Sequence, residues 1–170
     1  MKRMITVIAV AMLCLPAIAG AANTYSGQIL GGGDSVEGRV LLGPCERGKV
    51  GLGICWTDGL HGSQEAIQVA VVGLWDVVKD VNLPFVLPFA TGVGTIKASG
   101  YIGAEIGALT PTHGEAQFDT TAAGLVGLVI GDPSMQIGVE LAGALTDRFW
   151  SALADTPGSQ VRFFIAYRFK

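Results

Sequence analysis

Bulky apolar side chains alternate with small or polar ones along most of the chain. In the last segment one face carries Val161, Phe163, Ile165, Tyr167 and Phe169, and the other carries Arg162, Phe164, Ala166 and Arg168. The same alternation runs through residues 50–57, 67–76, 85–94 and 135–146. A hydrophobic pattern of period two predicts β-strands that turn one apolar face to an apolar environment.

The pattern predicts eight strands, at residues 24–31, 35–43, 49–57, 65–77, 83–96, 117–130, 135–146 and 160–169. Three of the connections are predicted as short turns: Pro44 to Gly48, Lys79 to Asn82 and Gly131 to Ser134. Three others are longer: Asp58 to Gln64, Lys97 to Ala116 and Asp147 to Ser159. A strand-like segment, 101–109, falls inside the longest of these loops, where it is expected to extend a strand or form a small lid.

Composition favours a membrane barrel over a helical protein. Half of the 170 residues are hydrophobic, 25 are glycine and only 15% are charged. After the N-terminal stretch no apolar run approaches the roughly 18 residues of a transmembrane helix. Backbone polar groups in a bilayer are satisfied only by helices or by closed barrels. We therefore expect an all-β fold, an eight-stranded antiparallel transmembrane β-barrel over residues 22–170, with both termini in the periplasm. A soluble periplasmic β protein, its apolar face turned inward, is the competing fold.

The first 21 residues are predicted to be a cleaved signal peptide. Lys2 and Arg3 precede an apolar run that ends at Pro16, and small residues follow at signal-peptidase spacing. Cleavage would leave nine basic and 14 acidic residues. This acidic balance excludes a nucleic-acid partner, and the signal predicts export to the outer membrane.

Two segments carry a family resemblance. The run Leu83-Pro-Phe-Val-Leu-Pro-Phe-Ala-Thr-Gly-Val-Gly94 resembles a Pro-aromatic, glycine-alternating strand of small Gram-negative outer-membrane barrels, the OmpA/OmpX-like eight-stranded proteins. The ending Phe163 to Phe169 resembles their closing strand, although Lys170 follows the aromatic residue that would usually be last. The resemblance implies the barrel fold and recognition of the last strand by the barrel-assembly machinery. It does not imply one function, because such barrels serve as anchors, adhesins, channels and enzymes.

Charged residues on the inward face are expected to form a polar network inside the barrel. Its predicted members are Glu37, Arg39, Asp76, Asp119, Glu140, Arg162 and Arg168. Unpaired buried charges cost several kcal/mol, so these side chains must pair. The hairpin geometry is expected to place Glu140 level with Arg168. A plugged interior held by ion pairs is the favoured interpretation, and a polar gate or narrow pore is the alternative.

Aromatic side chains are expected to form girdles at the two ends of the barrel wall. The predicted members are Trp56 near the outer rim, and Trp75, Phe85, Tyr167 and Phe169 near the periplasmic rim.

The sequence offers no catalytic or metal-binding signature. His61 and His113 lie in predicted loops without a matching motif. Cys45 and Cys55 are expected to remain unbridged, because an extended chain over residues 49–55 spans about 20 Å, whereas a disulfide needs Cα atoms within about 7 Å. No cofactor and no metal are expected.

The sequence therefore predicts a structural, surface-interaction or adhesion role through the extracellular loops, without enzymatic activity. The expected partners are outer-membrane lipid, the barrel-assembly machinery and an extracellular surface or protein. A narrow porin-like channel is one alternative. A lipid-modifying enzyme with a histidine at the barrel rim is another.

Overall fold

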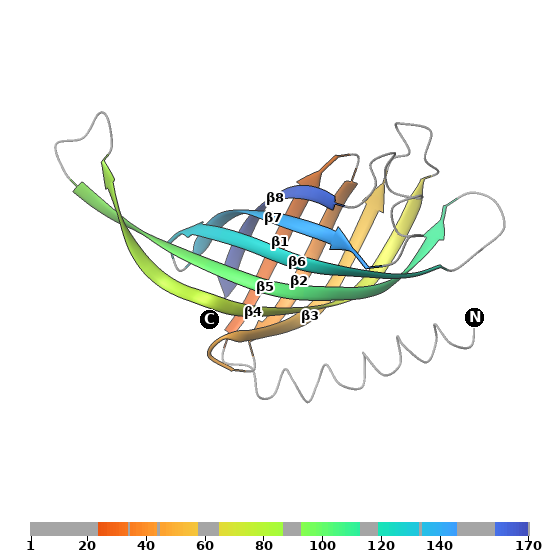
Figure 1. Ribbon diagram of the computed structural model, residues 1–170, viewed down its shortest axis with the longest axis horizontal. Coiled ribbons are helices and arrows are strands. Elements are labelled where there is room, and N and C mark those ends of the chain that lie inside the picture. The colour runs from red at the N-terminus through yellow and green to blue at the C-terminus, as the bar shows by residue number, and fades with distance from the viewer. Residues whose placement is uncertain are drawn as a thin grey trace.

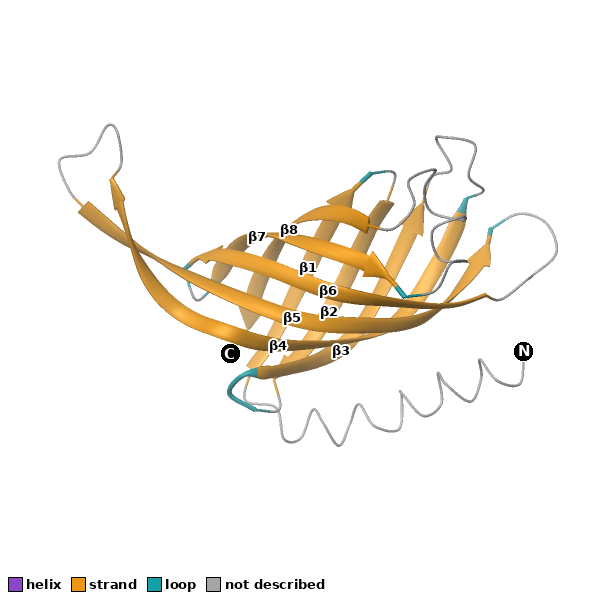
Figure 2. Ribbon diagram, in the orientation of Figure 1, coloured by secondary structure: helices purple, strands orange, loops and turns teal. Residues whose placement is uncertain are grey.

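A computed structural model describes residues 24–33, 35–43, 45–57, 65–86, 93–112, 119–132, 134–145 and 159–169. These residues form eight strands in one closed sheet (Figure 1), and they contain no helix (Figure 2). The strands are β1 (Thr24–Gly32), β2 (Ser35–Gly43), β3 (Gly48–Thr57), β4 (Ala66–Val86), β5 (Val93–Pro111), β6 (Asp119–Gly131), β7 (Met135–Ala144) and β8 (Ser159–Phe169). The predicted signal peptide lies outside the described residues.

Every strand pairs antiparallel with its sequence neighbours, and the sheet closes between β1 and β8. The closing register joins Tyr25 to Phe169 and Gly31 to Phe163. Closure gives each barrel strand a hydrogen-bonding partner on both sides, which removes the free edges of an open sheet.

Alternation of side chains divides the wall into two surfaces. The outward positions are apolar and exposed in the isolated chain, among them Ile29, Val40, Ile54, Ile106, Val126, Leu128, Leu141, Phe163 and Ile165. The inward positions hold the buried charges together with small and apolar residues. An apolar exterior around a polar interior is the arrangement of a transmembrane barrel and the inverse of a soluble β-sandwich.

The fourth and fifth strands differ from the prediction. The expected turn at Lys79 to Asn82 is absent: β4 runs through it to Val86, and β5 starts only at Val93. The strand predicted at 83–96 is thus the end of one strand and the beginning of the next. The segment Tyr101 to Leu109, expected in a loop, forms the barrel part of β5.

As a result β4 continues beyond β3, and β5 beyond β6, as a ribbon, here called the extension, of residues 77–86 and 93–99. Its residues 97–99 still pair with β6, so only residues 83–86 and 93–96 are two-stranded. It leaves the barrel at the end that also holds the first residue of β1 and the last residue of β8 (Figure 1). The pairing register shifts twice at its base, between Asp76 and Val78 and between Val78 and Val81. The sequence pattern predicts only a turn at this site. In the structure Asp80 has a positive φ of 52°, which is a conformation that turns also use.

The base of the extension is held by polar contacts. The Lys79 ammonium donates to the Glu46 carbonyl at 2.8 Å, and the Asp80 backbone N–H donates to the Ser99 hydroxyl at 3.0 Å. The Asp76 backbone N–H donates to the Arg47 carbonyl at 2.9 Å. These contacts fix where the extension leaves the barrel wall.

The other connections have unequal lengths at the two ends. At the end holding the extension, four residues join β2 to β3 and three join β6 to β7. At the opposite end, two residues join β1 to β2, eight join β3 to β4, seven join β5 to β6 and 14 join β7 to β8. In the β6–β7 turn, Asp132 accepts hydrogen bonds from the Ser134 hydroxyl and backbone N–H, which lower its carboxyl pKa.

Candidate functional site

Five charged side chains meet at the centre of the barrel. Arg39 on β2 donates to Glu37 at 2.5 Å, to Glu140 at 2.8 Å and to Glu105 at 3.0 Å. Arg162 on β8 donates to Glu37 at 3.0 Å, to Glu105 at 3.2 Å and to Glu140 at 3.4 Å. All five residues are at most 4% exposed. Each guanidinium therefore contacts all three carboxylates, and the contacts link β2, β5, β7 and β8 across the lumen.

An aromatic side chain joins this cluster to an apolar layer. The Tyr101 hydroxyl donates to Glu140 at 2.8 Å, and its ring lies 6.3 Å from that of Phe164, centroid to centroid. The layer consists of Leu30, Leu41, Val72, Leu74, Tyr101, Leu125, Val129, Ala142, Phe164 and Ala166. Leu41 on β2, Tyr101 on β5, and Phe164 and Ala166 on β8 lie between the charged cluster and the end that bears the extension, whereas Ala142 on β7 lies on the other side of Glu140.

Glycines make room for the large inward side chains. Five of them have a glycine directly opposite on the adjacent strand, in the pairs Leu41–Gly51, Leu74–Gly103, Tyr101–Gly127, Phe164–Gly138 and Arg39–Gly53. A methyl group added at Gly127 would overlap the Tyr101 ring, and one at Gly138 would overlap the Phe164 ring. This pairing of large with small residues fills an interior that is narrow in any eight-stranded barrel.

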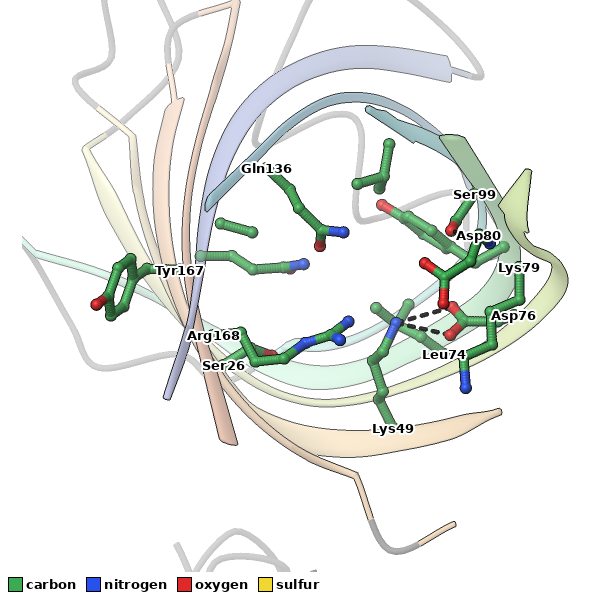
Figure 3. Close-up of a pocket in the computed structure, with 14 residues that line it drawn as sticks. Ser26, Lys49, Leu74, Asp76, Lys79, Asp80, Ser99, Gln136, Tyr167 and Arg168 are labelled. Atoms are coloured by element: carbon green, nitrogen blue, oxygen red, sulfur yellow. Dashed lines mark hydrogen bonds and ion pairs between the residues drawn. The ribbon is translucent and has the colours of Figure 1, made fainter. Parts of the chain in front are cut away.

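A second polar group closes the end beneath the apolar layer. There the Lys49 ammonium donates to both carboxylate oxygens of Asp76, at 2.8 and 2.9 Å. Figure 3 shows Arg168 and Gln136 pointing into the same mouth. The space between these side chains measures about 20 Å³, roughly what a single water molecule needs.

Hydrogen bonds between neutral groups occupy the opposite end of the interior. The Gln68 amide donates to the Thr121 hydroxyl at 2.9 Å. The Gln160 amide donates to the Gly32 carbonyl at 2.7 Å and to the Ser35 hydroxyl at 2.8 Å. The described interior is therefore layered: neutral polar groups, ion pairs, apolar residues, and a second ion pair.

The predicted network residues fall into three groups. Glu37, Arg39, Glu140 and Arg162 meet in the central cluster. Asp76 and Arg168 lie instead at the mouth that bears the extension. Asp119 is the first residue of β6, and its side chain lies outside the described part of the structure.

Two details of the predicted network need correction. Glu140 is level with Arg162 and not with Arg168, because β7 and β8 pair Glu140 with Arg162. Glu105 was not among the predicted members, yet it contacts both arginines. The available signal was the period-two pattern of residues 101–109, in which Tyr101 and Glu105 share a face with Leu109.

The aromatic residues predicted as girdles lie at the ends of the barrel wall, with one exception. Trp56 is 44% exposed at one end, and Trp75, Tyr167 and Phe169 are each 52% exposed at the other. Phe85 does not join them: it lies ten residues beyond Trp75 on the same strand, paired with Gly94 in the extension. The proline-containing run that resembles a barrel strand therefore begins in the extension and not in the barrel wall.

The remaining candidate residues show no site. Cys45 and Cys55 are both free, Cys45 exposed in the β2–β3 turn and Cys55 buried on the inward face. Among the described residues, no three His, Cys, Asp or Glu side chains are arranged to hold a metal ion. His61 and His113 lie outside the described residues. Nor does any helix in the described part have the length and hydropathy to cross a membrane.

Closure, an apolar outer wall and a charged, filled interior define the class: an eight-stranded antiparallel barrel of the outer-membrane type, with an OmpA-like fold. The structure is similar to the crystal structure of the N-terminal β-barrel domain of Pseudomonas aeruginosa OprF, with a TM-score of 0.51 and 12% sequence identity. The match covers 87% of this chain and 98% of the OprF chain. At this identity the likeness concerns the fold alone. No protein-family model and no curated protein matches the sequence.

Proposed function

We propose that this chain is a non-conducting outer-membrane barrel with a structural and surface-interaction role and no catalytic activity. The observation that supports this most directly is the cluster of Arg39, Arg162 and three glutamates across the centre of the lumen. A pore needs a continuous path of water, whereas this interior is spanned by side chains that bind one another.

The apolar layer strengthens the argument. A permeating ion that passed the Lys49–Asp76 pair would next meet Leu74, Leu41 and Phe164, which are at most 4% exposed. An ion pays a large desolvation cost in such a layer, because no polar group replaces its hydration shell. Both the charged and the apolar layer would have to rearrange before ions could pass.

The surface role rests on the two ends of the barrel. In outer-membrane barrels short turns face the periplasm and longer loops face outward. The 8-, 7- and 14-residue connections share the end away from the chain termini, so we assign them to the cell exterior. They are the segments expected to contact an external surface or protein.

Two measurements test the proposal together. Cells expressing the chain are fractionated, and the outer-membrane fraction is run on a gel with and without boiling, where a folded barrel is expected to shift on heating. The same purified barrel is then reconstituted in a planar lipid bilayer, with a known porin as the positive control. We expect a heat-dependent shift and no conductance steps above the protein-free baseline.

The outcomes separate the alternatives. Reproducible conductance steps that scale with salt concentration would overturn the non-conducting role and establish the narrow channel. A soluble periplasmic protein without a heat-dependent shift would overturn the membrane location itself.

A further inference from the structure

The extension is too thin to be stable by itself in water. Its outer part, residues 83–86 and 93–96, consists of two paired strands that lie beyond the last pairs of β3 and β6. A lone two-stranded hairpin is marginally stable, and a third strand or a packed face is generally needed. Something must therefore cover one of its surfaces.

Its two faces differ in chemistry. Cross-strand pairing places Val81 with Ala98 and Leu83 with Ile96 on one face, and Asn82 with Lys97 on the other. Val81 and Leu83 are 44% and 43% exposed. One face of the extension is thus apolar and uncovered, while the other is polar.

The apolar face continues the outer wall of the barrel. Trp75 and Ile102 form an outward pair at the point where β4 stops pairing with β3, and both are 52% exposed. Next along β5 is Gly100 on the same face, where an added Cβ would lie 3.4 Å from Leu128 and 3.9 Å from Val78. The surface proposed to face lipid therefore passes onto the extension without a polar interruption.

The apolar positions of β4 extend over a greater height than the apolar band of the membrane if the extension keeps the tilt of the barrel strands. Outward apolar positions on β4 run from Ile67 to Leu83, about 53 Å of strand at ~3.3 Å per residue. At a tilt of about 45° this corresponds to roughly 37 Å of height, against an apolar band about 25 Å tall. The part beyond the barrel can keep contact with lipid only by running along the membrane surface.

The base of the extension has the features for such a change of direction. Two register shifts and the positive φ of Asp80 lie between Asp76 and Val81. Bulges of this kind bend a strand and increase its twist.

The edges of the extension are poorly suited to pairing with another strand. Lys79 and Pro84 lie on β4, and lysine and proline are the residues that protect exposed edges from pairing. The apolar face, rather than an edge, is the available contact surface.

We propose that the apolar face of the extension, formed by Val78, Val81, Leu83, Ile96 and Ala98, lies on the lipid surface of the periplasmic leaflet. The extension then lies along the membrane interface and sets the depth and tilt of the barrel in the bilayer. This inference rests on the membrane role proposed above.

The test compares two adjacent positions on opposite faces. In a C14S/C45S/C55A background, Leu83→Cys and, as the matched control, Asn82→Cys are labelled with an environment-sensitive fluorophore. Each full chain is reconstituted in phosphatidylcholine–phosphatidylglycerol vesicles at low protein density. We expect nitroxide carried on the lipid to quench the Leu83 label at least two-fold more than the Asn82 label, and aqueous iodide to show the opposite order.

A heat-dependent gel shift for every variant separates this inference from the barrel assignment. If the barrels are folded but both labels are equally open to iodide, the extension does not lie on lipid and the inference fails. It also fails if protection of Leu83 appears only at high protein density, since that would indicate a second copy as the cover.

A second variant guards against an effect of the label. Val81→Lys, with the label at Ile96→Cys, should retain the heat-dependent shift and lose lipid quenching. Quenching unchanged by the lysine would contradict the proposed contact.

Discussion

At the scale of single residues, inward glycines decide which large side chains the barrel can hold. Tyr101 and Phe164 each lie against a glycine of the adjacent strand, and Tyr101 also donates to Glu140. A methyl group at such a glycine would displace an aromatic ring and disturb the hydrogen bond between Tyr101 and the charged cluster.

Gly127→Ala is therefore expected to destabilise the barrel, by about 1–3 kcal/mol as for other overpacked sites. Gly124→Ala is the matched control on the same strand, because an added Cβ there meets nothing within 4 Å. Urea unfolding in lipid vesicles measures both. Equal unfolding midpoints for the two variants would contradict the packing argument.

Much of the interior at this scale could be predicted from the sequence. Alternation alone places Glu37, Arg39, Glu140 and Arg162 on the inward face, where burial requires them to pair. It could not predict that Glu140 lies level with Arg162, because the long β7–β8 connection does not determine the register. The pattern does not predict Glu105 as a member, because it places residues 101–109 in a loop.

At the scale of elements, the main difference from the prediction is the extension. The sequence Lys79-Asp-Val-Asn82 has the polar composition of a tight turn, and Asp80 does adopt a positive φ. Here that conformation belongs to an irregularity within a continuing strand, since the pairing of β4 with β5 resumes at Val81. Composition cannot distinguish a turn from a bulge, because both need the same backbone conformation at one residue.

Asp80 is accordingly expected to tolerate glycine better than a β-branched residue. Asp80→Val should weaken the base of the extension by about 1–2 kcal/mol, the usual cost of the left-handed conformation for a substituted residue, whereas Asp80→Gly should not. Hydrogen exchange of amides in residues 78–99 would report the difference. Faster exchange in the valine variant alone is expected, and identical exchange in both would show that the positive φ carries no constraint.

At the scale of the whole molecule, the charged cluster links strands that are not neighbours in the sheet. Arg39 on β2 reaches Glu105 on β5 and Glu140 on β7, on distant parts of the wall. Buried ions are costly to leave without partners, so these contacts resist any change in the shape of the barrel's cross-section.

Arg39→Met leaves three carboxylates facing a single guanidinium, and a loss of about 3–5 kcal/mol of unfolding free energy is expected. Combining it with Glu140→Gln removes one of the unmatched carboxylates. The double variant should therefore be more stable than the sum of the two single losses predicts. Urea unfolding of the four chains measures this coupling, and simple additivity would argue against a shared network.

The closing of the sheet between β1 and β8 also constrains the order of assembly. Gly31 pairs with Phe163, about 130 residues further along, and contacts over such separations form slowly. Until β8 arrives, β1 has no partner on that side, and an unfinished sheet presents edges that can pair with other chains. The last strand, Ser159–Phe169, is therefore needed for closure. A chain truncated before these eleven residues can form seven strands but cannot close the barrel.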